Sequence, residues 1–199
     1  MTRAALAGAV LVALGAAGCG GSPTTTVTVI RTVTVTQTTA GSTTTGSTTT
    51  GRLSAAACTG QDLGGIFTVL AGSAGAGHIS YLLRLTNTSS APCFVSGLPA
   101  VQLLAKDGVA LPTHESAARP GTQTAARVEL PPGASATAQA RFSPDVPGSG
   151  EPQSGPCEPI AITLRIEATG GGTVDVPIKP VTSVCEHGSM QFSLLSRAG

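Results

Sequence analysis

The sequence predicts an all-β domain, an antiparallel β-sandwich of about seven to eight strands, over residues 53–199. Its apolar residues come in short runs, each five to seven residues long. Clusters of Gly, Pro, Asn and Ser separate these runs. No long segment between them repeats its apolar residues with the period of a helix. Short strands joined by tight turns are therefore expected throughout this part of the chain.

Eight of the runs are expected as strands because they are rich in branched and aromatic residues. In chain order they cover residues 66–70, 79–85, 100–104, 125–130, 136–142, 160–166, 173–178 and 190–195. The one helical element expected is a single turn at 61–63. Alternate residues of a strand face opposite sides, so the core is expected to receive Ile162, Leu164 and Ile166. The run 136–142 repeats this scheme with smaller residues.

The composition argues against nucleic acid as a partner. The chain of 199 residues has a formal net charge of +1 and 11% charged residues, well below the roughly 25% of ordinary soluble domains. With so little excess positive charge, no broad basic surface is expected for nucleic acid or for anionic lipid headgroups. Aromatic residues make up 3% and Trp is absent, so the core must be built mainly from Val, Leu, Ile and Ala.

Residues 1–18 are expected to be a lipoprotein signal peptide. Arg3 gives a positively charged start, an uninterrupted apolar run covers residues 4–17, and Gly18 precedes Cys19. This run fits the apolar core of an export signal and is shorter than the ~20 residues of a membrane-spanning helix. The segment ending at Cys19 resembles the bacterial lipobox, although Ala16 stands where Leu is usual. The alternative is an ordinary secretory signal that is cut near Ala17.

Lipidation of Cys19 would hold the protein on the extracytoplasmic face of the cell membrane through its N-terminal lipid. Residues 19–52 are then expected to be a disordered stalk, because a segment of mainly Thr, Ser and Gly cannot bury enough surface to offset the entropy of ordering. A hairpin or edge strand is the competing interpretation, since Val and Thr alternate in 27–29 and 33–36. The composition is also that of O-glycosylated stalks. All ten acidic residues lie at or beyond Asp62.

The cysteine count supports the same division of the chain. Five cysteines in an exported protein are an odd number, and Cys19 takes the separate task of carrying the lipid. The other four are expected to form two disulfides in an oxidising compartment: Cys58, Cys93, Cys157 and Cys185. Three pairings are possible, of which Cys58 with Cys93 and Cys157 with Cys185 is favoured. None of the four lies within 27 residues of another, so a zinc site built from close cysteine pairs is not expected.

Catalytic and metal-binding motifs are not found in the sequence. The histidines, His78, His114 and His187, lack an HExxH or similar spacing and are expected as exposed loop residues. No Gly-x-Ser-x-Gly segment is present. No catalytic residue, metal ligand or cofactor is therefore expected. Two alternatives stay open: a hydrolase that assembles His and acidic residues across the fold, and a metal-binding lipoprotein that uses His187, Met190 and nearby carboxylates.

Two motifs resemble the actinobacterial domain of unknown function 4232. The first reads LTNTS at 85–89, PC at 92–93 and GLP at 97–99, followed by the apolar run 101–104. The second is the Pro-Gly turn within 128–136, and two further matches are Cys157 and Cys185. The resemblance covers roughly residues 58–195. It departs at Leu98, where an aromatic residue is commoner, and at Phe142, where Trp is frequent.

The resemblance implies an immunoglobulin-like sandwich in a cell-envelope protein, often a lipoprotein, and it brings no activity and no functional residue. In the matched motifs, the side chains of Asn87 and Ser89 are expected to set a turn by hydrogen bonding to their own backbone. Gly97 and Gly133 are expected to take positive φ. The expected function is accordingly a non-enzymatic binding module of unknown ligand, whose partner is a protein or glycan of the cell envelope.

Overall fold

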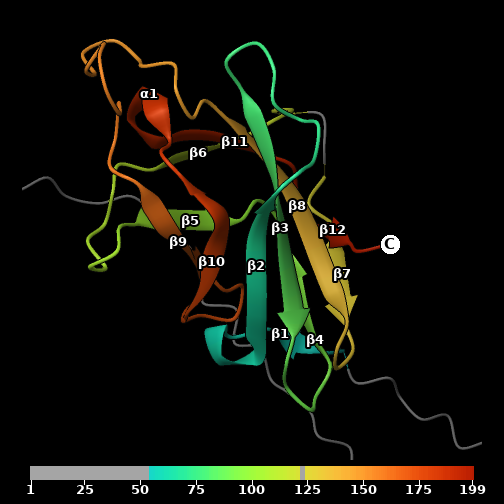
Figure 1. The fold of residues 1–199 in the computed structure, drawn as a ribbon. Helices are drawn as coiled ribbons and strands as arrows, with labels where there is room; N and C mark the ends of the chain where they lie inside the picture. Colours follow the sequence, from blue (N-terminus) through green and yellow to red (C-terminus); the bar gives the residue numbers. More distant parts are fainter. Residues whose placement is uncertain (1–53, 122–123) are drawn as a thin grey trace, which may run out of the picture. The chain divides into compact units, whose positions relative to one another are not determined.

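A computed structural model describes residues 54–121 and 124–199 (Figure 1). The predicted signal peptide, the lipidation of Cys19 and the stalk 19–52 lie outside these residues. The strands of the described part are β1 (Ala56–Ala57), β2 (Leu63–Val69), β3 (Ile79–Asn87), β4 (Cys93–Ser96), β5 (Ala100–Leu104), β6 (His114–Ala117), β7 (Arg127–Leu130), β8 (Ser135–Phe142), β9 (Ala161–Glu167), β10 (Thr173–Thr182), β11 (Ser189–Phe192) and β12 (Ser196–Arg197). A 3₁₀ turn, η1 (Gly60–Asp62), overlaps the predicted helical turn, and α1 (Cys185–Gly188) is a second short turn.

The strands form two sheets around one core. Nine strands join in the order β5-β9-β10-β2-β3-β8-β11-β6, with β12 added to β8, and β1, β4 and β7 form a smaller sheet. In Figure 1, β2, β3 and β8 run side by side through the middle of the domain. Apolar side chains from both sheets belong to one buried cluster. The predicted all-β sandwich is confirmed as the fold class.

The pairing of the strands is mixed, which corrects the prediction of wholly antiparallel sheets. Seven pairings are antiparallel, and short parallel ones join β1 to β4, β2 to β10 and β6 to β11. All eight predicted strands are present, as β2, β3, β5, β7, β8, β9, β10 and β11. The other strands of the described part have only two to four residues.

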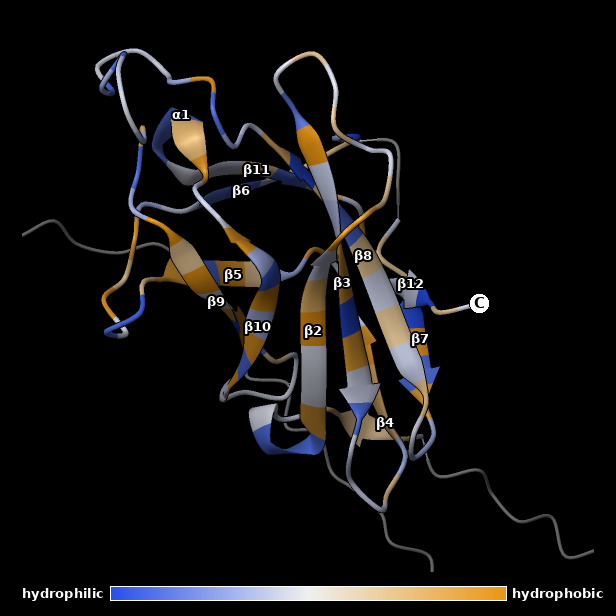
Figure 2. Ribbon diagram, in the orientation of Figure 1, coloured by the Kyte–Doolittle hydropathy of each residue, from blue (hydrophilic) through white to orange (hydrophobic). Residues whose placement is uncertain are grey.

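Side chains of the central strands alternate between core and solvent, as Figure 2 shows by its alternating colours. On β8 the buried positions are Ala136, Ala138, Ala140 and Phe142. On β9, Leu164 and Ile166 are buried as predicted, but Ile162 is only half-buried. The ladder between β9 and β10 is irregular beyond Pro177, and Ala161 takes the buried position at the start of β9.

Four aromatic rings gather in the core: Phe67 of β2, Tyr81 of β3, Phe142 of β8 and Phe192 of β11. The ring centroids of Phe67 and Tyr81 lie 5.0 Å apart, and those of Tyr81 and Phe142 lie 5.2 Å apart, both pairs tilted. The Tyr81 hydroxyl donates a hydrogen bond to the Pro180 carbonyl at 2.9 Å, which satisfies its polar group. Each buried ring of this size stabilises the fold by about 1.5–3 kcal/mol.

The turn after β3 is set by Asn87, as the motif predicts. The Ser89 N–H donates to the Asn87 side-chain oxygen at 2.9 Å, and the Gly133 N–H donates to the Asn87 carbonyl at 2.8 Å. Gly97 and Gly133 take positive φ values of 87° and 78°, as expected. The bond from Gly133 fixes the turn that follows β7, which forms one wall of the groove described next.

Candidate functional site

A groove of about 910 Å³ opens beside β7 and is lined by residues of β7, β12 and the loop before β4. Its walls are mainly apolar, with charged side chains set among them. The residues that matter below are Pro92, Arg127, Glu129, Pro131, Leu195 and Arg197. The sequence did not indicate this groove, because residues 70 positions apart form its two sides.

Strand β7 is an end strand of the smaller sheet, since it pairs with β4 on one side only. On β4 the Phe94 carbonyl accepts a hydrogen bond from the Cys58 N–H at 2.8 Å, so the backbone of Phe94 faces away from β7. Alternate residues of an antiparallel strand turn their N–H and C=O groups to opposite sides. In the observed register, Phe94 stands opposite Glu129. Glu129 and Arg127 therefore turn their backbone groups away from β4 and toward the open edge.

A side-chain contact supports the outward direction of the Glu129 backbone groups. The guanidinium of Arg197, on β12, donates to the Glu129 carbonyl at 3.3 Å. The neighbouring residues of β7, Val128 and Leu130, bury their side chains in the core. The open edge of β7 thus offers backbone hydrogen-bonding groups to the groove while the strand itself is held by its apolar side chains.

Arg127 is held at the edge by three different contacts. Its Cζ lies 3.7 Å from the centre of the Phe94 ring, a cation–π arrangement. Its Nε donates to Glu129 Oε1 at 3.0 Å, and its Nη2 donates to the Ala55 carbonyl. The side chain is still 37% exposed, so part of the guanidinium faces solvent. Two arginines and one glutamate give the lining a formal charge of +1.

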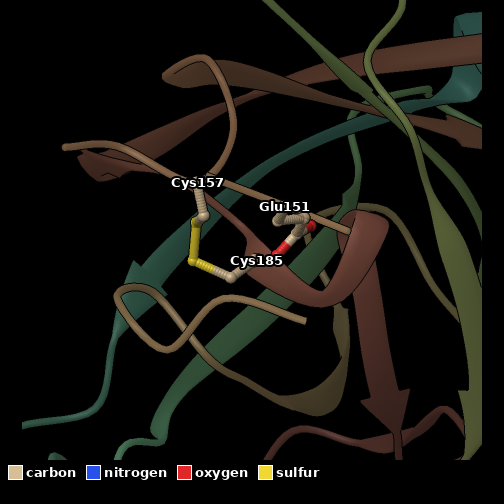
Figure 3. Close-up of side chains that lie close together, drawn as sticks. All are labelled: Glu151, Cys157 and Cys185. Carbon is tan, nitrogen blue, oxygen red and sulfur yellow. A yellow bond between two sulfur atoms is a disulfide. The ribbon is translucent and has the colours of Figure 1, made fainter. Parts of the chain in front are cut away.

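The structure joins Cys58 to Cys93 and Cys157 to Cys185, the two pairs that the sequence favours. The first disulfide ties the chain after β1 to β4, beside the groove. The second lies at the start of α1, where Figure 3 shows it close to Glu151. Cys19 lies outside the described residues.

Around the second disulfide, a buried carboxylate holds an unusual turn. Glu186 and His187 take left-handed backbone angles, with φ of 55° and 56°. The Glu151 carboxylate accepts the N–H groups of both, and that of Gly148 at 2.6 Å. Its side chain is 1% exposed. Burial alone would raise the pKa of Glu151, but the backbone donors, His187 first, outweigh burial and hold this pKa below its ordinary value.

The histidines do not share one environment. His78 lies in the connection between β2 and β3, where its Nδ1 is 3.0 Å from the Ala76 carbonyl oxygen, and His114 lies exposed on β6. His187 is 53% exposed, as predicted for a surface residue. Met190, by contrast, is fully buried in the core. The structure therefore gives the suggested pair of His187 and Met190 different surroundings.

The sequence did not indicate that Glu151, Glu158 and His187 converge near the second disulfide. Glu151 and Glu158 both lie within 4.0 Å of His187. No local spacing joins residue 151 to residue 187, so only the pairing of Cys157 with Cys185 could have suggested it.

Comparisons with known proteins give one match. The family model described as "Domain of unknown function (DUF4232)" matches residues 58–194. No curated protein and no solved structure matches the chain. Within residues 54–121 and 124–199, no helix has the length and apolar character needed to cross a membrane.

Proposed function

The chain belongs to the DUF4232 family, and we propose that this member is a cell-envelope lipoprotein whose β-sandwich binds an extended segment of a partner protein along the open edge of β7. The proposed role is binding without catalysis. Export and lipid anchoring are supported by the positively charged start at Arg3, the apolar run that follows it and Cys19. The two disulfides of the domain agree with an oxidising compartment.

The observation that carries the proposal is the open edge of β7 inside a groove. An extended segment that adds to a sheet edge gains affinity from main-chain hydrogen bonds and specificity from its alternate side chains. β7 has four residues, and Arg127 and Glu129 turn their backbone groups outward. A partner strand of about four residues would match this length.

The charge of the groove indicates the chemistry of the partner. Arg127 and Arg197 flank the edge, and a guanidinium binds a carboxylate through two parallel hydrogen bonds. Pro92, Pro131 and Leu195 supply apolar contact area. The partner segment is therefore expected to alternate acidic and apolar residues.

The chain's own residues 20–52 fit this chemistry poorly. They contain no acidic residue, and their charges are Arg31 and Arg52. A positively charged segment would be repelled by the arginines of the groove. A different protein is accordingly the proposed occupant.

The test is a selection of random decapeptides on the full chain, followed by fluorescence anisotropy with an enriched peptide. Enriched peptides should contain Glu or Asp, and replacing these by Lys should weaken binding about tenfold or more. Arg197→Met should weaken it several-fold, whereas the charge-matched control Lys106→Met, on a distant turn, should not. Enrichment of basic peptides, or equal effects of the two substitutions, would contradict the proposal. Competition by residues 20–52 would show that the chain occupies its own groove.

A further inference from the structure

Three side chains at the other end of the domain bring oxygen and nitrogen donors to one point. His187 Nδ1 lies 3.6 Å from Glu151 Oε1 and 3.9 Å from Glu158 Oε1. The three donor atoms all lie within 4.8 Å of one another. Ligands bonded at about 2.1 Å to a tetrahedral zinc ion stand roughly 3.4 Å apart. Small side-chain movements would therefore bring these donors into coordination.

The fold positions each of the three donors. Glu158 follows Cys157 directly, and His187 follows Cys185 by two residues, so their disulfide aligns the two segments. Glu151 is fixed by the N–H groups that its carboxylate accepts. These bonds do not use all the lone pairs of the carboxylate, because each oxygen has two.

The ring of His187 is oriented by a group outside this set. Its Nε2 lies 3.0 Å from the Ser149 carbonyl oxygen, and because a carbonyl only accepts, Nε2 carries the hydrogen. In the neutral imidazole the lone pair then belongs to Nδ1, which faces the two carboxylates. Histidines that bind metals commonly donate their other N–H to a backbone carbonyl in this way.

The charge balance at this point favours a cation. The carboxylates of Glu151 and Glu158 have side-chain exposures of only 1% and 15%. Among the described residues, the ion pairs of both involve His187 and no Lys or Arg. Buried charges are costly unless they are paired or coordinate a metal. Among the described residues, these two largely buried carboxylates thus share His187 as their one ion-pair partner.

We propose that Glu151, Glu158 and His187 form a binding site for a divalent first-row transition-metal ion, with zinc as the representative. An imidazole and two carboxylates suit such ions, whereas Ca²⁺ takes six to eight oxygen ligands. The exposed side of His187 leaves a path for the ion and room for water as further ligands. Cys157 and Cys185 are joined to each other and are not ligands. The bound ion would tie the connection between β8 and β9 to the turn α1.

Isothermal titration calorimetry with Zn²⁺ tests this site. The full chain is used, with Cys19→Ser in every sample so that its thiol adds no ligand. The proposal predicts one zinc ion per chain, a rise in the unfolding temperature with zinc, and no such response to Ca²⁺. His187→Ala and Glu158→Gln should each weaken zinc binding about tenfold or more. Glu151 is left intact because it holds the turn.

Matched controls separate the site from incidental binding. His78→Ala removes another histidine, and Glu167→Gln removes a carboxylate at the far end of β9. Both should bind zinc as the parent chain does. Circular dichroism establishes that each variant is folded. Zinc binding that is absent, or that falls equally in the site and control variants, would overturn the proposal.

Discussion

The side-chain amide of Asn87, at the end of β3, donates a hydrogen bond to the carbonyl of Leu130, at the end of β7, at 2.8 Å. The same amide donates to the Ala91 carbonyl at 2.8 Å, and the residue is fully buried. Because β3 and β7 belong to different sheets, one side chain joins the two. It also fixes the end of the strand whose open edge forms the groove.

Replacement of Asn87 should therefore destabilise the whole domain. Asn87→Ala removes the two hydrogen bonds that its amide donates to the Leu130 and Ala91 carbonyls, and also the oxygen that accepts the Ser89 N–H, which we expect to lower the free energy of unfolding by about 2–4 kcal/mol. Urea unfolding of the full chain measures this change. Thr88→Ala, which removes a hydrogen bond at an exposed position, is the control and should cost about 0.5–1 kcal/mol. Equal losses in the two variants would contradict the role given to Asn87.

The two disulfides should contribute similarly to stability but differently to zinc binding. Their cysteines are 35 and 28 residues apart, and loops of this length predict about 3–4 kcal/mol for each bridge. Replacing Cys157 and Cys185 together by Ser should also weaken zinc binding, because Glu158 and His187 lose their alignment. Replacing Cys58 and Cys93 should not. Titration calorimetry measures the zinc affinity of both folded double variants. Equal zinc affinity in the two would count against the site.

The ion pair between Arg165 and Asp175 should make a small contribution that depends on pH. These residues stand opposite each other on β9 and β10, with contacts of 2.7 and 2.8 Å. The hydrogen bond from Arg165 holds the pKa of Asp175 below its ordinary value. The stabilisation is therefore present above the unfolded pKa and is lost as the pH falls through the lower, folded pKa.

Asp175→Asn tests this pH dependence. Both side chains are more than 40% exposed, so at neutral pH the variant should unfold only about one to three degrees lower than the parent. The difference should disappear in acid, at a pH below the lowered pKa of Asp175, where the parent carboxyl is also protonated. A difference of the same size at both pH values would show that packing, not charge, causes it.

Glu151→Gln should loosen the left-handed turn. The carboxylate accepts the N–H groups of Glu186 and His187, and a carboxamide replaces one of its acceptor oxygens by a donor. Hydrogen exchange at these two amides should accelerate, and the unfolding temperature should fall by several degrees. Glu158→Gln, which removes no hydrogen bond to a backbone N–H of this turn, serves as the control. Unchanged exchange in Glu151→Gln would mean that the turn is held by other contacts.

The success and failure of the sequence predictions have a physical pattern. Runs of branched and aromatic residues located eight of the strands, and the local turn of Asn87 was expected because its oxygen reaches a residue two positions away. Its bond to Leu130 spans 43 residues and leaves no local signal. The same reason applies to the candidate sites. Whether β7 is an end strand, and whether Glu151 meets His187, depends on strand order and on a disulfide, which only the folded chain determines.

Amide hydrogen exchange on the full chain, measured by NMR with and without the enriched acidic peptide, tests the binding role of β7 most directly. Arg127 and Glu129 turn their N–H groups to the open edge, whereas Val128 and Leu130 already face β4. We predict that the peptide slows exchange at Arg127 and Glu129 about tenfold or more and changes Val128 and Leu130 little. Protection that falls elsewhere on the domain, or that leaves Arg127 and Glu129 unchanged, would contradict strand addition at β7.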